Sequence, residues 1–178
     1  VPTMGHTGGN HCEIRLTDVR VPRGNLLGKR GEGFVIAQKR LGPGRIFHCM
    51  RWLGQAQRAF ELMCERVKTR FAHGSLLSEK GEIQAYIAES AAEIQAARLM
   101  TLDAARAMDE GDEARIEIAL IKFWGARMLH NVVDRAIQVH GGLGLTSDTP
   151  LEFMYREPRY ARIYDGPDEV HRMTVARR

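Results

Sequence analysis

Residues 113–140 read EARIEIALIKFWGARMLHNVVDRAIQVH, and this stretch decides the fold. Four apolar residues in it recur at the spacing i, i+3, i+4 and i+7: Leu129, Val132, Val133 and Ala136. This spacing places the four side chains on one face of an α-helix. We therefore expect a long helix here that buries this face against neighbouring helices.

The surrounding sequence predicts two more long helices. No proline occurs between Pro43 and Pro150, and glycines gather where the apolar pattern pauses, at 74–81 and at Gly111-Asp112. Because glycine and proline break helices most strongly, we place turns at these glycines. The expected helices lie near 32–70, 82–109 and 113–140, and the short connections make them antiparallel.

Several apolar residues are expected to pack between these helices. The second helix repeats the same spacing with Ile83, Ile87, Ala91 and Ile94. Trp52 and Trp124 lie within predicted helices and are expected to pack in the core.

The two ends of the chain differ from this helical middle. The segment His11–Val21 alternates polar and apolar residues, which is typical of a half-buried strand that needs a neighbouring sheet. We therefore assign 1–30 to the tail of a β-domain with its linker, and 31–178 to a helical bundle domain. After residue 141 we expect two short helices separated by Asp165-Gly166-Pro167.

Composition excludes several classes of protein. The chain has 26 Lys+Arg against 22 Asp+Glu, a net charge of +4, without charge runs, so a role in nucleic-acid binding has little support. No apolar run reaches the length of a transmembrane helix. The cysteines, at 12, 49 and 64, are too widely scattered for a disulfide framework. Metal binding is not expected, because no i, i+4 pairing is shared by His6, His11, His48, His130 and His171.

The segment Tyr164–Glu169, YDGPDE, is the first candidate site. A carboxylate in this Gly-Pro turn could lie against an apolar pocket, where burial raises its pKa and makes it a usable general base. The alternative is an ordinary turn in which Asp168 or Glu169 caps the final helix.

Two further segments could bind a ligand. In Gln138–Gly144, the glycines would let a backbone approach a ligand closely, or would simply cap the preceding helix. In 70–84, Arg70, His73 and Ser75 could bind phosphate, or the segment could be a solvated turn.

The whole chain resembles the C-terminal part of the acyl-CoA dehydrogenase family. The blocks that carry the resemblance are Asp18–Pro22, Asn25–Gly28, Gly31–Phe34, Gln138–Gly142 and Arg159–Gly166, in the family's order. The forms of Leu41–Arg45 and Asp165–His171 look most like the acyl-CoA dehydrogenase 10/11 subgroup. The resemblance implies a mainly α fold, an up-down helical bundle preceded by the last strand or strands of a β-domain.

The resemblance also implies a reaction. In the family, FAD takes a hydride from the substrate β-carbon while a carboxylate removes the α-proton, giving a trans-2-enoyl-CoA. The resemblance places Asp165, whose side chain is one methylene shorter, at the position of the usual catalytic Glu. It also places Arg45 and Gly166 beside the substrate. Some members carry the base on the first long helix, at the position of Gly44 here, where glycine cannot serve.

Flavin contacts implied by the resemblance come largely across subunits. The matching positions are Arg70, Phe71, Ala72, Ile83, Gln84, Gln138, Val139, His140, Gly141, Gly142, Pro167, Asp168 and Glu169. Such sites go with a homodimer or a homotetramer.

Further expectations follow from the same resemblance. They are an acyl-CoA substrate, an electron-transfer flavoprotein as acceptor, a bacterial cytoplasmic or mitochondrial matrix location, and inactivity of these residues alone. The alternatives are a flavin oxidase of nitroalkane oxidase type, a branch that also uses Asp as base, and a non-catalytic helical oligomerisation module.

Overall fold

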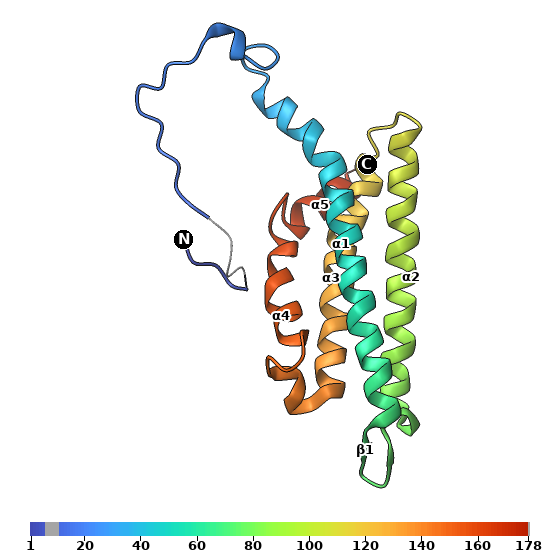
Figure 1. Cartoon of the computed structure of the whole chain (residues 1–178). Helices are drawn as coiled ribbons and strands as arrows, with labels where there is room; N and C mark the ends of the chain where they lie inside the picture. Colours follow the sequence, from blue (N-terminus) through green and yellow to red (C-terminus); the bar gives the residue numbers. More distant parts are fainter. Residues whose placement is uncertain (6–10, 178) are drawn as a thin grey trace.

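The computed structural model describes residues 1–5 and 11–177. Within these residues the chain forms five α-helices, four short 3₁₀-helices and one two-stranded hairpin (Figure 1). The α-helices are α1 (Gly33–Thr69), α2 (Gly81–Asp109), α3 (Arg115–His140), α4 (Leu151–Arg156) and α5 (Asp168–Ala176). The 3₁₀-helices are η1 (Arg23–Asn25), η2 (Leu77–Glu79), η3 (Gly141–Leu145) and η4 (Glu157–Arg162), and the strands are β1 (Phe71–Ala72) and β2 (Ser75–Leu76).

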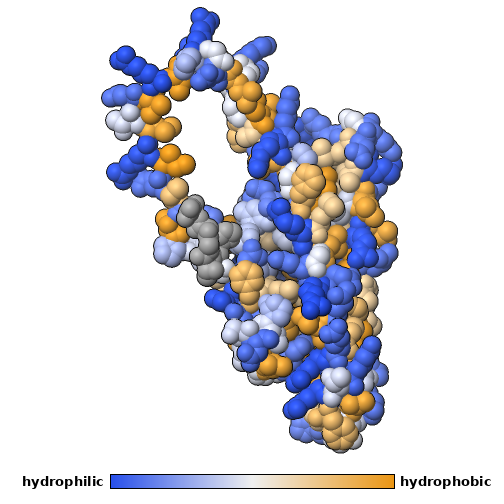
Figure 2. Space-filling model, viewed as in Figure 1, coloured by the Kyte–Doolittle hydropathy of each residue, from blue (hydrophilic) through white to orange (hydrophobic). Residues whose placement is uncertain are grey.

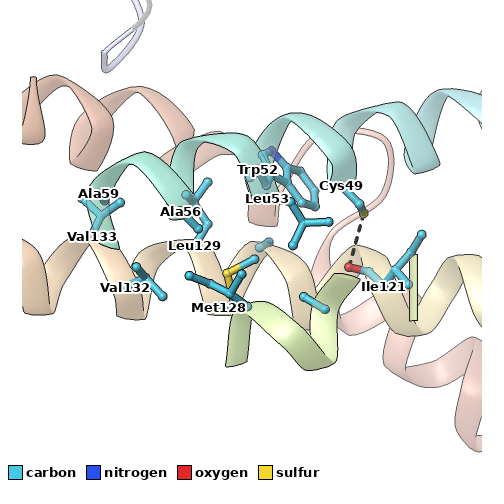
Figure 3. Packing of buried hydrophobic residues seen from close by; sticks show 14 of the residues in the cluster. Cys49, Trp52, Leu53, Ala56, Ala59, Ile121, Met128, Leu129, Val132 and Val133 are labelled. Atoms are coloured by element: carbon cyan, nitrogen blue, oxygen red, sulfur yellow. Dashed lines mark hydrogen bonds between the residues drawn. The ribbon is translucent and has the colours of Figure 1, made fainter. Parts of the chain in front are cut away.

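The three long helices α1, α2 and α3 pack against one another in an up-down bundle, as the sequence predicts (Figure 1). The apolar stripe of α3, formed by Leu129, Val132, Val133 and Ala136, is fully buried. Opposite it on α1 lie Ala56 and Ala59, whose small side chains let the two helices approach closely (Figure 3). Burial of large apolar side chains against small ones is the main stabilisation of this bundle.

One glycine of α3 has a packing role that its helix propensity opposes. A Cβ at Gly125 would lie 3.4 Å from the Trp52 ring, so the absence of a side chain gives this ring its place between the helices. One turn earlier on α1, the Cys49 thiol donates a hydrogen bond to the Ile121 carbonyl oxygen at 3.4 Å (Figure 3). These contacts fix how far α1 lies along α3, which matters because α1 carries part of the site.

Two packing expectations are wrong in part. Ala91 is exposed, because the preceding residue, Ser90, lies on the face of α2 that meets α1 and α3. The buried residues of α2 are Ser90, Ile94, Ala97, Thr101 and Ala104. Trp124 is 37% exposed, whereas Trp52 is 3% exposed. A residue directly after a buried position turns about 100° away from it, and this rotation carries Ala91 out of the core.

The strand predicted over His11–Val21 is not formed in this structure. This segment runs as an extended arm without ladder hydrogen bonds, because the described residues contain no strand beside it to pair with. Its apolar residues, among them Ile14, Leu16 and Val21, are exposed. Figure 2 shows hydrophobic groups along the arm between hydrophilic ones. The apolar side chains of this alternating segment are thus not covered by another element among the described residues. The β-domain origin of 1–30 stays a prediction.

The C-terminal part contains the two short helices that the sequence predicts, α4 and α5, with η4 between them. The loop Ile163–Pro167 after η4 leads into α5, which packs on α3. The segment 70–84 holds a feature that the sequence analysis missed, a hairpin in which His73 and Gly74 both have positive φ (50° and 82°). A two-residue turn of this kind joins antiparallel strands with the right twist.

Candidate active site

Asp165 lies at the centre of the site, on a loop with an uncommon backbone. Asp165 has a φ of 54° and Gly166 a φ of 100°, both in the region that favours glycine. A Cβ at Gly166 would lie 2.8 Å from the Nε2 atom of His171. The loop therefore requires glycine at 166, both for its backbone conformation and for the space beside His171.

Three helices hold this loop through its backbone carbonyl groups. Arg45 on α1 donates its Nε–H to the Asp165 carbonyl oxygen at 2.9 Å, and His171 on α5 donates its Nε2–H to the same oxygen at 3.2 Å. Lys122 on α3 donates to the carbonyl oxygens of Ala161 at 2.7 Å and of Gly166 at 3.2 Å. The Asp165 backbone is thus fixed from three directions.

Lys122 is a charged side chain inside the protein. It is completely buried, and its Nζ lies 5.5 Å from the centre of the Trp52 ring and 5.2 Å from that of Tyr164. Desolvation by burial lowers the pKa of Lys122 to about 8. The two carbonyl bonds and the two ring faces compensate part of the cost of burying this ammonium group.

The Asp165 carboxylate itself contacts a histidine that the sequence analysis did not assign to the site. Its Oδ2 lies 3.1 Å from Nε2 of His48, and the two side chains are 20% and 22% exposed. His48 follows Arg45 by three positions on α1, so both residues lie on the same helix face. In the sequence, this spacing after Arg45 was the signal that could have placed His48 at the site. The histidines were considered there as metal ligands only.

The other ring nitrogen of His48 is also engaged. The Tyr164 hydroxyl donates to Nδ1 at 2.7 Å, and Arg51 Nη2 is in contact with the same atom. Desolvation by burial, followed by the nearby Arg51 charge, lowers the pKa of His48, although Asp165 opposes this shift. The same burial raises the pKa of the Tyr164 hydroxyl. Tyr164, His48 and Asp165 therefore form one chain of polar contacts.

Two cavities border this chain of residues, one at Asp165 and the other at His48 and Tyr164. A cleft of about 970 Å³ is lined by residues of α1, α3 and α5 and reaches Arg45, Asp165 and Gly166. Its wall combines apolar groups such as Phe34 with basic ones such as Lys39. A second cavity of about 650 Å³ is lined by His48, Trp52 and Tyr164 among others. Asp165 thus lies where a ligand in the cleft can reach a carboxylate.

The residues predicted to contact a flavin fall into two separate groups. Arg70, Phe71, Ala72, Ile83, Gln84 and Gln138–Gly142 lie at the end of the bundle that carries the hairpin (Figure 1). Pro167, Asp168 and Glu169 follow Asp165, with Arg45 nearby. Arg45 and Thr69 are 24 residues apart in α1, which at a rise of about 1.5 Å per residue is about 36 Å. The structure does not bring these two groups together within one chain.

Within the distal group, the glycine cap predicted at the end of α3 is confirmed. Gly141 has a φ of 62° and is the C-cap residue of α3. Val139 and His140 are buried, whereas Phe71, Gln84 and Gln138 are exposed. Gly142 has neither a positive φ nor any atom within 4 Å of a Cβ built on it, so the fold of this chain does not itself require glycine there.

Asp168 differs from the predicted helix cap. Its side chain makes no capping bond at the start of α5; instead Oδ2 accepts a hydrogen bond from Arg162 Nε at 2.8 Å. The side chain is 1% exposed, and its Oδ1 is buried without a hydrogen-bond partner among the described residues. Pairing with Arg162 thus draws this carboxylate into the protein, away from the helix end, while Pro167 and Glu169 remain exposed.

The described residues contain neither a metal-binding cluster nor a membrane-spanning helix. No group of three or more His, Cys, Asp or Glu side chains is placed to hold a metal ion within 1–5 and 11–177, and His6 lies outside these residues. Nor does that part of the chain contain a helix with both the length and the apolar character needed to span a bilayer.

The bundle has the fold of a helical domain found in one class of oxidoreductases. A family model described as the C-terminal domain of acyl-CoA dehydrogenase matches residues 31–178. The chain belongs to the acyl-CoA dehydrogenase family, a family of oxidoreductases.

Three comparisons illustrate this membership. The chain is 53% identical over 169 residues to FadE2 of Mycobacterium tuberculosis, covering 94% of this chain and 42% of that protein. It is 51% identical over 171 residues to mouse acyl-CoA dehydrogenase family member 10, covering 95% of this chain and 16% of the mouse protein. Butyryl-CoA dehydrogenase of Megasphaera elsdenii matches with a TM-score of 0.85 at 32% identity, covering 89% of this chain and 42% of that one. The chain thus spans less than half the length of these relatives.

Proposed function

We propose that this chain is the C-terminal catalytic part of an FAD-dependent acyl-CoA dehydrogenase, with Asp165 as the base that removes the substrate α-proton. The observation that carries the proposal is the Asp165 carboxylate, which is partly exposed at the cleft on a loop whose backbone is held from α1, α3 and α5. A base fixed in this way keeps its position relative to a bound substrate, which is the condition for efficient proton transfer.

The residues present fit a flavin, in a particular arrangement. The hairpin end of the bundle offers exposed groups and Gly142, which this chain does not need for its own packing. Because this end lies about 36 Å from Arg45 along α1, one flavin does not reach both groups of a single chain. The separation supports a homodimer or homotetramer in which each chain contacts two flavins.

The residues of the chain perform the proton chemistry. Asp165 receives the α-proton, and Arg45 and His171 hold its backbone carbonyl group while the carboxylate changes charge. Basic side chains along the cleft, including Lys39 and Arg45, suit the phosphates of a CoA thioester. The chemistry that FAD supplies when bound is acceptance of a hydride from the β-carbon. An electron-transfer flavoprotein as final acceptor belongs to the same proposal.

The test measures anaerobic flavin reduction by a panel of acyl-CoA thioesters in the full-length holoenzyme. Wild type, Asp165→Asn and a control, Asp103→Asn, are compared; Asp103 pairs with Arg106 on the exposed surface of α2. We expect bleaching of the flavin band in wild type and control, and its loss in Asp165→Asn with FAD still bound. Equal bleaching in Asp165→Asn contradicts Asp165 as the base.

A second candidate is an oxidase on the same scaffold, of the nitroalkane oxidase type. It is favoured by one observation, an aspartate in place of the glutamate usual for the dehydrogenases. Oxygen uptake in the absence of an electron-transfer flavoprotein distinguishes it from a dehydrogenase. Absence of bleaching with every acyl-CoA, together with normal FAD content and assembly, supports the third alternative, a non-catalytic oligomerisation module.

A further inference from the structure

The position of the ring proton on His48 follows from the groups around Nδ1. Tyr164 O–H lies 2.7 Å from this atom, and Arg51 Nη2 also contacts it. A guanidinium nitrogen carries hydrogens and has no lone pair to offer, so it acts only as a donor. Nδ1 is therefore the acceptor in this environment, and it carries no proton.

The neutral ring then has its proton on Nε2, the atom that faces Asp165 Oδ2 at 3.1 Å. A second proton, on Nδ1, would point at the Arg51 guanidinium in a half-buried position. The lowered pKa of His48, caused first by burial and next by Arg51, agrees with this exclusion of the charged ring. His48 thus offers the base one N–H group and no positive charge.

We propose that neutral His48 is the positioning residue of the catalytic base: its Nε2–H holds Oδ2 of Asp165 and leaves Oδ1 free for the substrate α-proton. This inference rests on the proposed function and names a residue for it. Aspartate is one methylene shorter than glutamate, so its carboxylate depends more on the backbone and on neighbours for its position. Arg45 and His171 hold the backbone carbonyl group of Asp165 and not its carboxylate. His48, on α1, holds the carboxylate itself.

The proton balance of the step is simple. One C–H bond of the substrate breaks, its proton forms an O–H bond at Oδ1 of Asp165, and the electron pair stays with the substrate for the oxidation that the flavin performs. His48 gives up no proton and takes none.

Other charged or titratable groups around His48 and Asp165 come from every element packed against them. They are Arg45 and Arg51 on α1, Lys122 on α3, His171 and Asp168 on α5, and Tyr164 on the loop. All of them stay in place in the variants that test the proposal. A change in rate on substitution of His48 is therefore read against a constant background.

The experiment compares His48→Ala, which removes the donor, with His48→Gln, whose amide N–H can occupy the place of Nε2–H. His130→Ala is the matched control, because the Nδ1–H of His130 donates to the carbonyl oxygen of Ala126 on its own helix, and its ring packs near Tyr155. All are assayed as full-length holoenzymes for the limiting rate of anaerobic flavin reduction and the substrate dissociation constant, across pH, with FAD content and melting temperature recorded.

We expect His48→Ala to slow flavin reduction by about 100-fold, the effect of a reacting group displaced by about 1 Å. The dissociation constant should stay within about threefold of wild type, and His48→Gln should recover most of the rate. A purely structural role would lower the melting temperature of both variants without this rescue.

A second measurement addresses the tautomer without turnover. The ¹⁵N chemical shifts of histidine-labelled wild-type holoenzyme should show His48 protonated at Nε2 and unprotonated at Nδ1 near neutral pH. An Nδ1-protonated or doubly protonated ring overturns the inference, as does a wild-type rate in His48→Ala when Asp165→Asn abolishes reduction. If wild type itself is reduced by no acyl-CoA, the proposed function fails instead, and the tautomer result still decides the geometry.

Discussion

Substitution of Gly166 by alanine tests whether the loop geometry controls the base. The new Cβ would lie 2.8 Å from His171 Nε2, a distance that real Cβ atoms do not keep, at a φ of 100°. A side chain in this backbone region costs about 1–3 kcal/mol. His171 must also move, which removes its hydrogen bond to the Asp165 carbonyl oxygen, worth about 0.5–1.5 kcal/mol. We therefore expect a destabilisation of about 2–4 kcal/mol.

This destabilisation corresponds to a fall in melting temperature of about 4–16 °C for a domain of this size. Because the loop relaxes by moving its backbone, the Asp165 carboxylate moves with it, and we expect the limiting rate of anaerobic flavin reduction to fall about 100-fold. Stopped-flow absorbance of the full-length holoenzyme measures the rate, and thermal melting measures the stability. FAD content is measured alongside, since the predicted flavin contacts at the hairpin end are not touched but Pro167, Asp168 and Glu169 directly follow Gly166.

Gly54→Ala is the matched control for this variant. Gly54 lies within α1 with no atom within 4 Å of a Cβ placed on it, and its φ is not positive. Alanine there should raise stability by up to about 1 kcal/mol, the difference in helix propensity, and leave the rate unchanged. A Gly166→Ala enzyme with wild-type melting temperature and rate would refute the argument that this loop sets the position of the base.

Three further outcomes are expected. The pKa of Lys122 is lowered to about 8, so the folded protein binds fewer protons than the unfolded chain between pH 8 and about 10.4. The contribution of this group to the free energy of unfolding therefore rises with pH across that window. Lys122→Met should remove that rise from melting curves recorded at pH 7–10; parallel curves for both proteins contradict it. Asp168→Asn should cost about 1.5–3 kcal/mol by weakening the bond to Arg162, and an unchanged melting temperature would count against a structural role. Tyr164→Phe should slow flavin reduction by about tenfold, less than His48→Ala, because only one donor to Nδ1 is lost; no change would show that Arg51 suffices.

The long helices were predictable because their information is local. The spacing of Leu129, Val132 and Ala136 places them on one helix face whatever the rest of the chain does, and they are buried as expected. The breaks at the glycines near 74–81 and at Gly111 were predictable for the same reason. The error at Ala91 has the opposite cause, since only the positions of α1 and α3 decide which part of an alanine-rich face is covered.

Asp165 could be singled out from its turn and from the family resemblance, but its surroundings could not. His48 and Tyr164 are 116 residues apart in sequence, and Lys122 is 44 residues from the Gly166 carbonyl oxygen that it holds. No periodicity connects such pairs. Their contacts exist because α1, α3 and α5 pack with one register, fixed in part by Trp52 against Gly125.

The sequence by itself therefore determined the class of fold and the family, and it singled out Asp165 as the candidate base, because helix periodicity and short motifs are properties of neighbouring residues. Only the tertiary structure decided that His48 faces the carboxylate, that Asp168 is buried against Arg162, and that the two groups of predicted flavin contacts lie at different places along the bundle. Each of these depends on how rigid helices are set against one another, and that arrangement is the result of the packing of many side chains at once.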